Sequence, residues 1–228
     1  MLEKRLIVLY LALASLLAGC TGGGARAAQP ISDFYPDQRP LAKTLVYDCN
    51  GYDFIARLGP GEMAVWLPDH YVILSQVRSA SGTKYVEGDI EFWSKGDEAI
   101  LSVGDQQYLN CALVPGRVPW EDARRRGVEF RAVGNEPGWS LEIQGDKHLL
   151  FLGDYGMRRV ATPNPGVQLQ GEVRRYHAVT ESADLQVEIV QQPCFDSMSG
   201  EAFTSQVTVT LNDETFYGCG RDLDYPWE

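Results

Sequence analysis

Apolar residues recur at every second position through much of this 228-residue chain. Ile90 and Phe92 are spaced in this way, and so are Val207, Val209 and Leu211. A period of two is typical of β-strands with one buried face, and Gly, Asp and Asn separate the runs as they do in turns. The sequence contains no long amphipathic helical pattern. Short, recurrent strands therefore predict a mainly β protein built from antiparallel barrels or sandwiches.

Residues 1–19 have the pattern of an export signal. Lys4 and Arg5 precede an apolar run that is too short for a membrane-spanning helix. The run ends in LAGC, which resembles a bacterial lipobox and so implies cleavage before Cys20 and its acylation. Acyl chains would anchor the protein in a membrane, because each buried methylene contributes about 0.8 kcal/mol. Thr21 follows the cysteine in place of Asp, and the resemblance to bacterial sorting rules then implies the outer membrane. The anchored protein is expected to face the periplasm.

A flexible tether is predicted for residues 20–43. The stretch TGGGARAAQP, which follows the cysteine, consists mostly of small residues and has no periodicity. Such a composition is typical of a linker, and it would let the folded part stand away from the bilayer.

The segment VPGRVPWEDARRRG separates two β-rich parts of the chain. Pro115, Gly116 and Pro119 interrupt any regular pattern there, and a short charged helical turn is expected from Trp120. Roughly 185 residues follow the tether, a length that fits one or two domains. The apolar content of 44% is enough for real cores. The predicted boundaries are a first domain at 44–114, a linker at 115–127 and a second, mostly β domain at 128–228.

Four cysteines remain after Cys20, and the export signal places them in an oxidising compartment. They allow three pairings, of which the nested and the crossed one would each tie the two halves of the chain together. Sequential pairing, Cys49 with Cys111 and Cys194 with Cys219, is therefore preferred. In the chain-entropy model these bridges would contribute about 4 and about 3.5 kcal/mol. A metal site is not expected, because the sequence has no CxxC or CxxH spacing.

Four features occur in order over residues 44–112: an early cysteine, a Ser-Gly-x-Lys-Tyr loop, a Trp-x-Lys-Gly segment and a tyrosine followed closely by a cysteine. In this order they resemble the bacterial membrane-bound and periplasmic inhibitors of c-type, or chicken-type, lysozyme. The resemblance implies a small antiparallel β-barrel of eight strands with one disulfide. The sequence departs from the family pattern at the end, where two residues separate Tyr108 from Cys111 instead of one.

The resemblance also implies which residues meet the enzyme. A lysozyme cleft holds two carboxylates ~5 Å apart, one a general acid and the other ionised. A serine hydroxyl can hydrogen-bond to the acid, and a lysine ammonium can pair with the ionised carboxylate. Ser81 and Lys95 match the inserting residues of the family, and Gly82 would let the loop tip turn. Lys84, which is closer to Ser81 in the sequence, is the other candidate for the lysine that pairs with the carboxylate. Tyr85 would either pack beneath the loop or face the enzyme. The complete partner-binding set is Ser81, Gly82, Lys84, Tyr85, Lys95 and Tyr108.

The charge of the first domain is consistent with this partner. Residues 44–112 contain ten Asp and Glu against four Lys and Arg, a net charge of −6. Such a field favours encounter with the strongly basic lysozymes of this class. It argues against a nucleic-acid partner, because no basic stripe is present to neutralise phosphates. The ordinary alternative is that an acidic surface aids solubility.

The sequence contains no recognisable catalytic motif. His70, His148 and His177 are scattered, and neither a Gly-x-Ser-x-Gly motif nor a cluster with metal-ligand spacing is present. We therefore expect no enzyme, no cofactor and no metal. The prediction is a lipid-anchored inhibitor of c-type lysozyme. The alternative is an envelope module that binds a small molecule or cell-wall component without inhibiting lysozyme.

The second domain is less informative. It resembles a domain of other bacterial envelope lipoproteins, and that resemblance implies no biochemical role. Asn135 and Glu136 precede Trp139, while Asp196 and Ser199 follow Cys194. These polar residues would either line a ligand pocket or cap turns.

Overall fold

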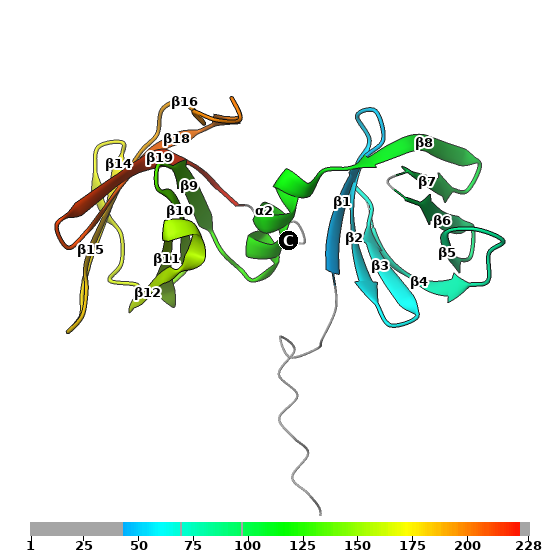
Figure 1. Ribbon diagram of the computed structural model, residues 1–228, viewed down its shortest axis with the longest axis horizontal. Coiled ribbons are helices and arrows are strands. Elements are labelled where there is room, and N and C mark those ends of the chain that lie inside the picture. Colours follow the sequence, from blue (N-terminus) through cyan, green and yellow to red (C-terminus); the bar gives the residue numbers. More distant parts are fainter. Residues whose placement is uncertain (1–42, 69, 97, 224–228) are drawn as a thin grey trace, which may run out of the picture. The chain divides into compact units, whose positions relative to one another are not determined.

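The computed structural model describes residues 43–68, 70–96 and 98–223 and is mainly strand, as predicted (Figure 1). The predicted signal peptide, Cys20 and all but the last residue of the tether lie outside the described residues. That last residue, Lys43, begins the first strand. Within the described part of the chain, no helix has both the length and the apolar character needed to span a membrane.

The first eight strands form a closed antiparallel barrel. Each strand pairs with its neighbours in the chain, and the eighth returns to the first through Tyr47 opposite Leu113 and Asp48 opposite Ala112. The eight-stranded barrel implied by the family resemblance is thus confirmed. Its strands are β1 (Lys43–Asp48), β2 (Asp53–Gly59), β3 (Glu62–Trp66), β4 (Tyr71–Val77), β5 (Thr83–Glu87), β6 (Ile90–Lys95), β7 (Glu98–Val103) and β8 (Gln106–Leu113).

The barrel interior is a packed aromatic and aliphatic core, as expected for a barrel of this strand number. The ring of Tyr47 lies 5.1 Å from that of Phe54 and 5.3 Å from that of Phe92, measured between centroids. The disulfide between Cys49 and Cys111 belongs to the same core and matches the predicted pairing. It fastens the end of β1 to β8, where the barrel closes.

The first strand is buried on both faces, which the period-two rule does not predict. Leu45 and Tyr47 point into the barrel core, whereas Thr44 and Val46 are buried outside that cluster. The Thr44 hydroxyl donates a hydrogen bond to Asp122 Oδ1 over 2.6 Å, so a helix covers the outer face of this strand. A strand covered on both faces has a continuous rather than alternating apolar pattern.

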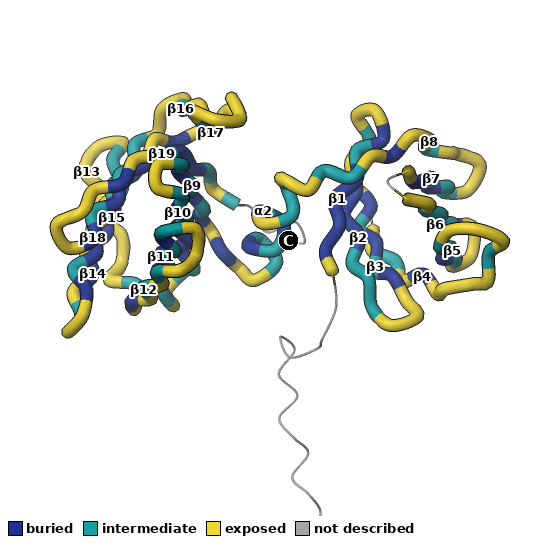
Figure 2. Tube along the Cα trace, in the orientation of Figure 1, coloured by how far each residue is buried: buried dark blue, intermediate teal, exposed yellow. Residues whose placement is uncertain are grey.

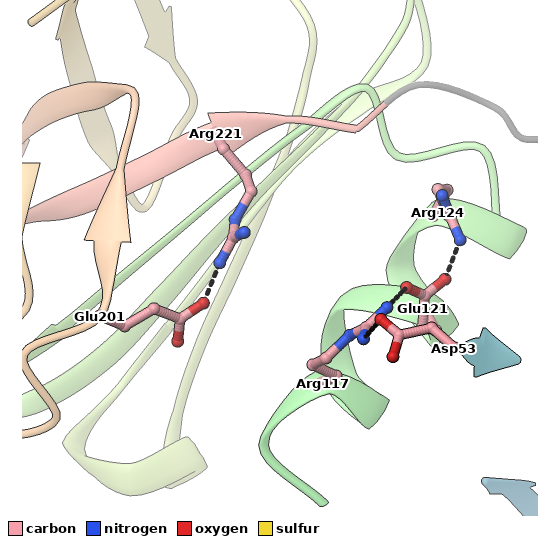
Figure 3. A network of polar contacts seen from close by, with 6 residues as sticks. All are labelled: Asp53, Arg117, Glu121, Arg124, Glu201 and Arg221. Atoms are coloured by element: carbon pink, nitrogen blue, oxygen red, sulfur yellow. Dashed lines mark hydrogen bonds and ion pairs between the residues drawn. The ribbon is translucent and has the colours of Figure 1, made fainter. Parts of the chain in front are cut away.

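The covering helix is α2 (Val118–Arg125), preceded by the 3-10 turn η2 (Pro115–Arg117). It begins two residues before the predicted start at Trp120, because Pro119 fits the first turn of a helix. Arg117 lies between Asp53 of the barrel and Glu121 of the helix, and contacts both (Figure 3). Glu121 is buried and also pairs with Arg124, so its charge is balanced within the helix.

The remaining strands form a nine-stranded antiparallel sheet and a small hairpin. The sheet order is β12-β11-β10-β9-β19-β18-β15-β14-β13, and β12 contacts β14, so that the sheet curls around its own core. The elements are β9 (Phe130–Asn135), β10 (Gly138–Gln144), β11 (His148–Gly153), η3 (Asp154–Gly156), β12 (Arg158–Pro163), β13 (Gln168–Gln170), β14 (Val173–Val179), β15 (Asp184–Val190), β16 (Cys194–Phe195), β17 (Ala202–Phe203), β18 (Ser205–Leu211) and β19 (Glu214–Asp222).

This sheet has a separate hydrophobic core, and the buried segments of each β-rich part stand out in Figure 2. Phe151 and Phe216 are at its centre, with ring centroids 5.0 Å apart. The predicted disulfide between Cys194 and Cys219 is present and ties the hairpin strand β16 to β19. Beside that hairpin, Arg221 pairs with Glu201 (Figure 3). Each β-rich part therefore has its own core and its own disulfide, as the cysteine spacing predicts.

Candidate functional site

The Ser81–Gly82 loop and the Lys95 segment are direct neighbours in the barrel. The β5–β6 ladder pairs Thr83 with Ser94, which brings the loop before β5 against the end of β6. Gly82 has a φ of 68°, and a Cβ placed on it would collide with the Ser94 carbonyl oxygen and lie 3.1 Å from the Cβ of Lys95. The residue types expected to act together thus come from two adjacent loops.

Side chains fix the loop at the Ser81 carbonyl. This oxygen accepts hydrogen bonds from Trp93 Nε1 over 2.9 Å and from the Ser79 hydroxyl over 3.1 Å. The Ser79 hydroxyl also lies 2.8 Å from the Gly82 carbonyl oxygen. Ser81 itself is exposed.

The two candidate lysines differ in their surroundings. Lys84 Nζ lies 2.7 Å from Glu91 Oε1 on the adjacent strand, so its charge is already paired. Lys95 is exposed at the end of β6, opposite Glu98 in the β6–β7 ladder. Among the carboxylates of residues 43–68, 70–96 and 98–223, none forms an ion pair with Lys95. The Lys84 ammonium is thus paired within the barrel, whereas the Lys95 side chain is exposed.

Tyr85 lies beneath the loop, not on the surface. Its side chain belongs to the barrel core and is only 6% exposed, with its ring 6.4 Å from that of Phe92. Burial raises the pKa of its phenol. The Tyr85 side chain thus packs in the barrel interior and does not face solvent.

Tyr108 lies away from the Ser81 and Lys95 loops. Lys95 on β6 pairs with Glu98 on β7, which in turn pairs with Ala112 on β8. Tyr108 is four residues from Ala112 along β8. The Tyr108 ring stacks on Tyr52 with centroids 3.8 Å apart. Its hydroxyl donates to Gln106 Oε1 over 2.8 Å. The structure thus does not bring Tyr108 to the Ser81 and Lys95 loops.

The extra residue between Tyr108 and Cys111 forms a β-bulge. Ala99 is paired with Cys111 and Leu101 with Tyr108, so three steps along β8 match two along β7. Asn110 takes up the insertion with a φ of 56°, a conformation that asparagine tolerates better than most residues. Both Tyr108 and Cys111 still pack against the barrel core.

In the second sheet, hydrogen bonds connect three of the polar residues noted in the sequence, Asn135, Asp196 and Ser199. Asn135 Nδ2 donates to Asp196 Oδ2 over 2.7 Å, and Asp196 Oδ1 accepts from the backbone N–H of Met198 and of Ser199. Burial alone would raise the pKa of Asp196, but the bonds from Ser199, Asn135 and Met198 outweigh it and hold this pKa below its usual value. Trp139 is a buried core residue. Asp196 therefore caps a turn, and Asn135 and Asp196 also line a pocket of about 260 Å³, so both arrangements expected from the sequence occur here.

Comparison with known proteins places the barrel in a family. The family model for the membrane-bound lysozyme-inhibitor of c-type lysozyme matches residues 47–110. A protein of Escherichia coli (strain K12) named "Membrane-bound lysozyme inhibitor of C-type lysozyme" is 32% identical over 116 residues, which are 50% of this chain and 95% of that relative. The chain belongs to this family. A relative of the same name from Yersinia enterocolitica is 32% identical over 79 residues, 33% of this chain and 68% of the relative. No solved structure matches the chain.

The lysozyme-inhibitor family model covers Ser81, Gly82, Lys95 and Tyr108 and ends one residue before Cys111. The nine-stranded sheet lies outside it.

The contact between Trp93 and the Ser81 carbonyl was not predicted, although Trp93 belongs to the Trp-x-Lys-Gly segment. The only available signal was its position two residues before Lys95, which puts both side chains on the same face of a strand.

Proposed function

We propose that this chain inhibits c-type lysozyme by inserting Ser81 and Lys95 between the enzyme's two catalytic carboxylates. The observation that carries the proposal is that the Gly82 backbone lies so close to Ser94 and Lys95 that a Cβ would not fit, so the two loops are side by side at the barrel surface. The family name supports lysozyme as the partner. The roles of Ser81 and Lys95 rest on their match to the inserting residues of the family that the sequence resembles.

The chemistry of the two side chains suits the cleft of a retaining glycosidase. Its general acid is a neutral carboxyl group with a raised pKa, and its second carboxyl group is ionised, ~5 Å away. The Ser81 hydroxyl can donate to or accept from the first group. The Lys95 ammonium can make a charge-assisted bond to the second, which is roughly twice as strong as a neutral one once water is displaced. A sugar ring could not then occupy the same space.

The rest of the chain would bring this site to the enzyme. We propose that acylated Cys20 anchors the protein in the outer membrane, facing the periplasm, and that the residues after it form a tether. The net charge of −6 over residues 44–112 would accelerate encounter with a basic enzyme and make association sensitive to salt. The role is that of an inhibitor and not of an enzyme.

An inhibition assay on chicken lysozyme tests the proposal. The chain from residue 21 onward, without its lipid, should block cell-wall hydrolysis at nanomolar concentration. Ser81→Ala should weaken the block by about 3- to 10-fold, the range for one net hydrogen bond between neutral groups. Lys95→Ala should weaken it by ~30-fold or more, as for the truncation of one partner of a desolvated charge pair.

Ser102→Ala is the matched control. Ser102 is also a barrel serine, but it pairs with Glu91 at the opposite end of the β6–β7 ladder from Lys95. Its replacement should leave inhibition unchanged. If the unmodified chain fails to block lysozyme at micromolar concentration, the proposal is wrong and the alternative of an envelope binding module is favoured.

A further inference from the structure

We propose that Trp93 is a positioning residue for the inhibitory loop. Its indole N–H, donating to the Ser81 carbonyl oxygen over 2.9 Å, would hold the loop in the conformation that binds the enzyme before the enzyme arrives. This inference rests on the proposed function, because it concerns how the same site is presented. It assigns to β6 two tasks: to carry Lys95 and to hold Ser81.

The strand geometry makes both tasks possible. Trp93 and Lys95 are two residues apart on β6, so their side chains leave the same face of the strand. Trp93 lies opposite Lys84 in the ladder, and its side chain reaches past that pair to a loop twelve residues earlier in the chain. The same strand, β6, thus carries Lys95 and holds the loop that contains Ser81.

The loop has little else to hold it. The β4–β5 ladder ends at Val77 opposite Lys84. Within the described residues, no backbone-to-backbone hydrogen bond outside the strand ladders involves positions 78–82. The loop is instead held by the Trp93 indole, by the Ser79 hydroxyl and by the contact of Gly82 with β6. Two of these three restraints act on the same atom, the Ser81 carbonyl oxygen.

A loop held in advance binds more tightly, because less ordering remains to be done on association. If only a fraction of the free molecules has the competent loop, the apparent dissociation constant rises by the inverse of that fraction. Loss of the indole bond should lower that fraction and slow association. Loss of the Ser81 hydroxyl should instead speed dissociation, since it removes a contact made in the complex.

Trp93→Phe tests the inference, because it keeps an aromatic ring on the barrel wall and removes the N–H donor. We expect its affinity for chicken lysozyme to fall about 3- to 10-fold, the range for one net hydrogen bond, mainly through a lower association rate. In the free protein, the backbone order parameters of Ser81 and Gly82 should decrease. Ser79→Ala should have an effect in the same direction. Trp120→Phe, a tryptophan that packs on Phe203, is the matched control and should leave the affinity unchanged.

A double-mutant cycle separates positioning from a general structural effect. If Trp93 acts through Ser81, the Trp93→Phe effect should shrink in the Ser81→Ala background. Equal effects in both backgrounds, or unchanged loop order in free Trp93→Phe, would overturn the inference. The proposed function fails on a different result, namely if Ser81→Ala and Lys95→Ala both retain full inhibition. The order parameters of the loop are measured on the free protein, so they test the role of Trp93 whatever the inhibition assay shows.

Discussion

The ammonium of Lys84 lies 2.7 Å from the carboxylate of Glu91, on the adjacent barrel strand. This ion pair distinguishes Lys84 from Lys95, although both lysines lie near the Ser81 loop. Pulling Lys84 toward a partner would break an existing pair, whereas Lys95 has no such pair among the described carboxylates. The two lysines thus have different surroundings in the barrel.

Lys84→Ala should therefore have little effect on inhibition. Its pair with Glu91 is partly exposed and contributes about 1 kcal/mol or less to stability. Inhibition constants for Lys84→Ala and Lys95→Ala, measured in the same buffer, check the difference. A larger loss of inhibition for Lys84→Ala than for Lys95→Ala would show that Lys84, and not Lys95, is the inserting lysine.

Gly82→Ala should disrupt the site. An alanine at a φ of 68° is strained by roughly 1–2 kcal/mol, and here its Cβ would also collide with the Ser94 carbonyl. The loop must move away from β6, so inhibition should weaken by about 10-fold, the factor that corresponds to about 1.4 kcal/mol. Gly88→Ala is the control, because Gly88 has a φ of 58° but open space around it. It should cost stability and leave inhibition intact; equal inhibition constants for the two variants would contradict the account.

Tyr47 should make the barrel sensitive to alkaline pH. Burial first, and the neighbouring Tyr85 second, raise the pKa of Tyr47 to about 12. A group with a raised folded pKa stabilises the fold fully below its unfolded pKa, ~10 for tyrosine, and this contribution disappears as the pH rises through the folded value. Stability should thus fall between pH ~10 and about 12, by an amount on the order of 2–3 kcal/mol.

Chemical unfolding followed between pH 8 and 12 measures this loss. Tyr47→Phe removes the ionisable group and keeps the ring, so its stability should depend less on pH in that window. A Tyr47→Phe profile parallel to that of the unmodified chain would show that another group is responsible.

Glu142 should be critical for the stability of the second sheet. Its carboxylate is buried and pairs with Arg131 and Arg126, and the side chain of Arg131 is only 12% exposed. Glu142→Gln leaves a buried guanidinium without its counter-charge, which should cost about 3–5 kcal/mol. Glu214→Gln, which breaks the exposed pair with Arg158, should cost at most about 1 kcal/mol. Urea unfolding of the two variants checks this, and similar losses would contradict it.

The strands and the disulfides follow from local patterns, so the sequence could predict them. Alternation at Ile90 and Phe92 reflects a strand with one face in a core, and sequential cysteine pairing follows from two separately packed parts. The closed barrel of eight strands came only from the family resemblance, because period two does not distinguish a barrel from a sandwich. The double burial of Thr44 and Val46 was not predictable, since it depends on α2 covering β1.

The candidate site was predictable in its residue types but not in its supports. Ser81 and Lys95 could be named from the resemblance, whereas the Trp93 bond depends on the β5–β6 register and on how the loop turns back. Tyr85 could not be placed inside or outside the barrel until that register was known. The bulge at Asn110 likewise shows only in the β7–β8 pairing.

The most direct test of the central claim is a crystal structure of the chain from residue 21 onward bound to chicken lysozyme. The account predicts Ser81 Oγ and Lys95 Nζ within hydrogen-bonding distance of the enzyme's general acid and its ionised partner, respectively. A complex in which neither atom enters the cleft would contradict it.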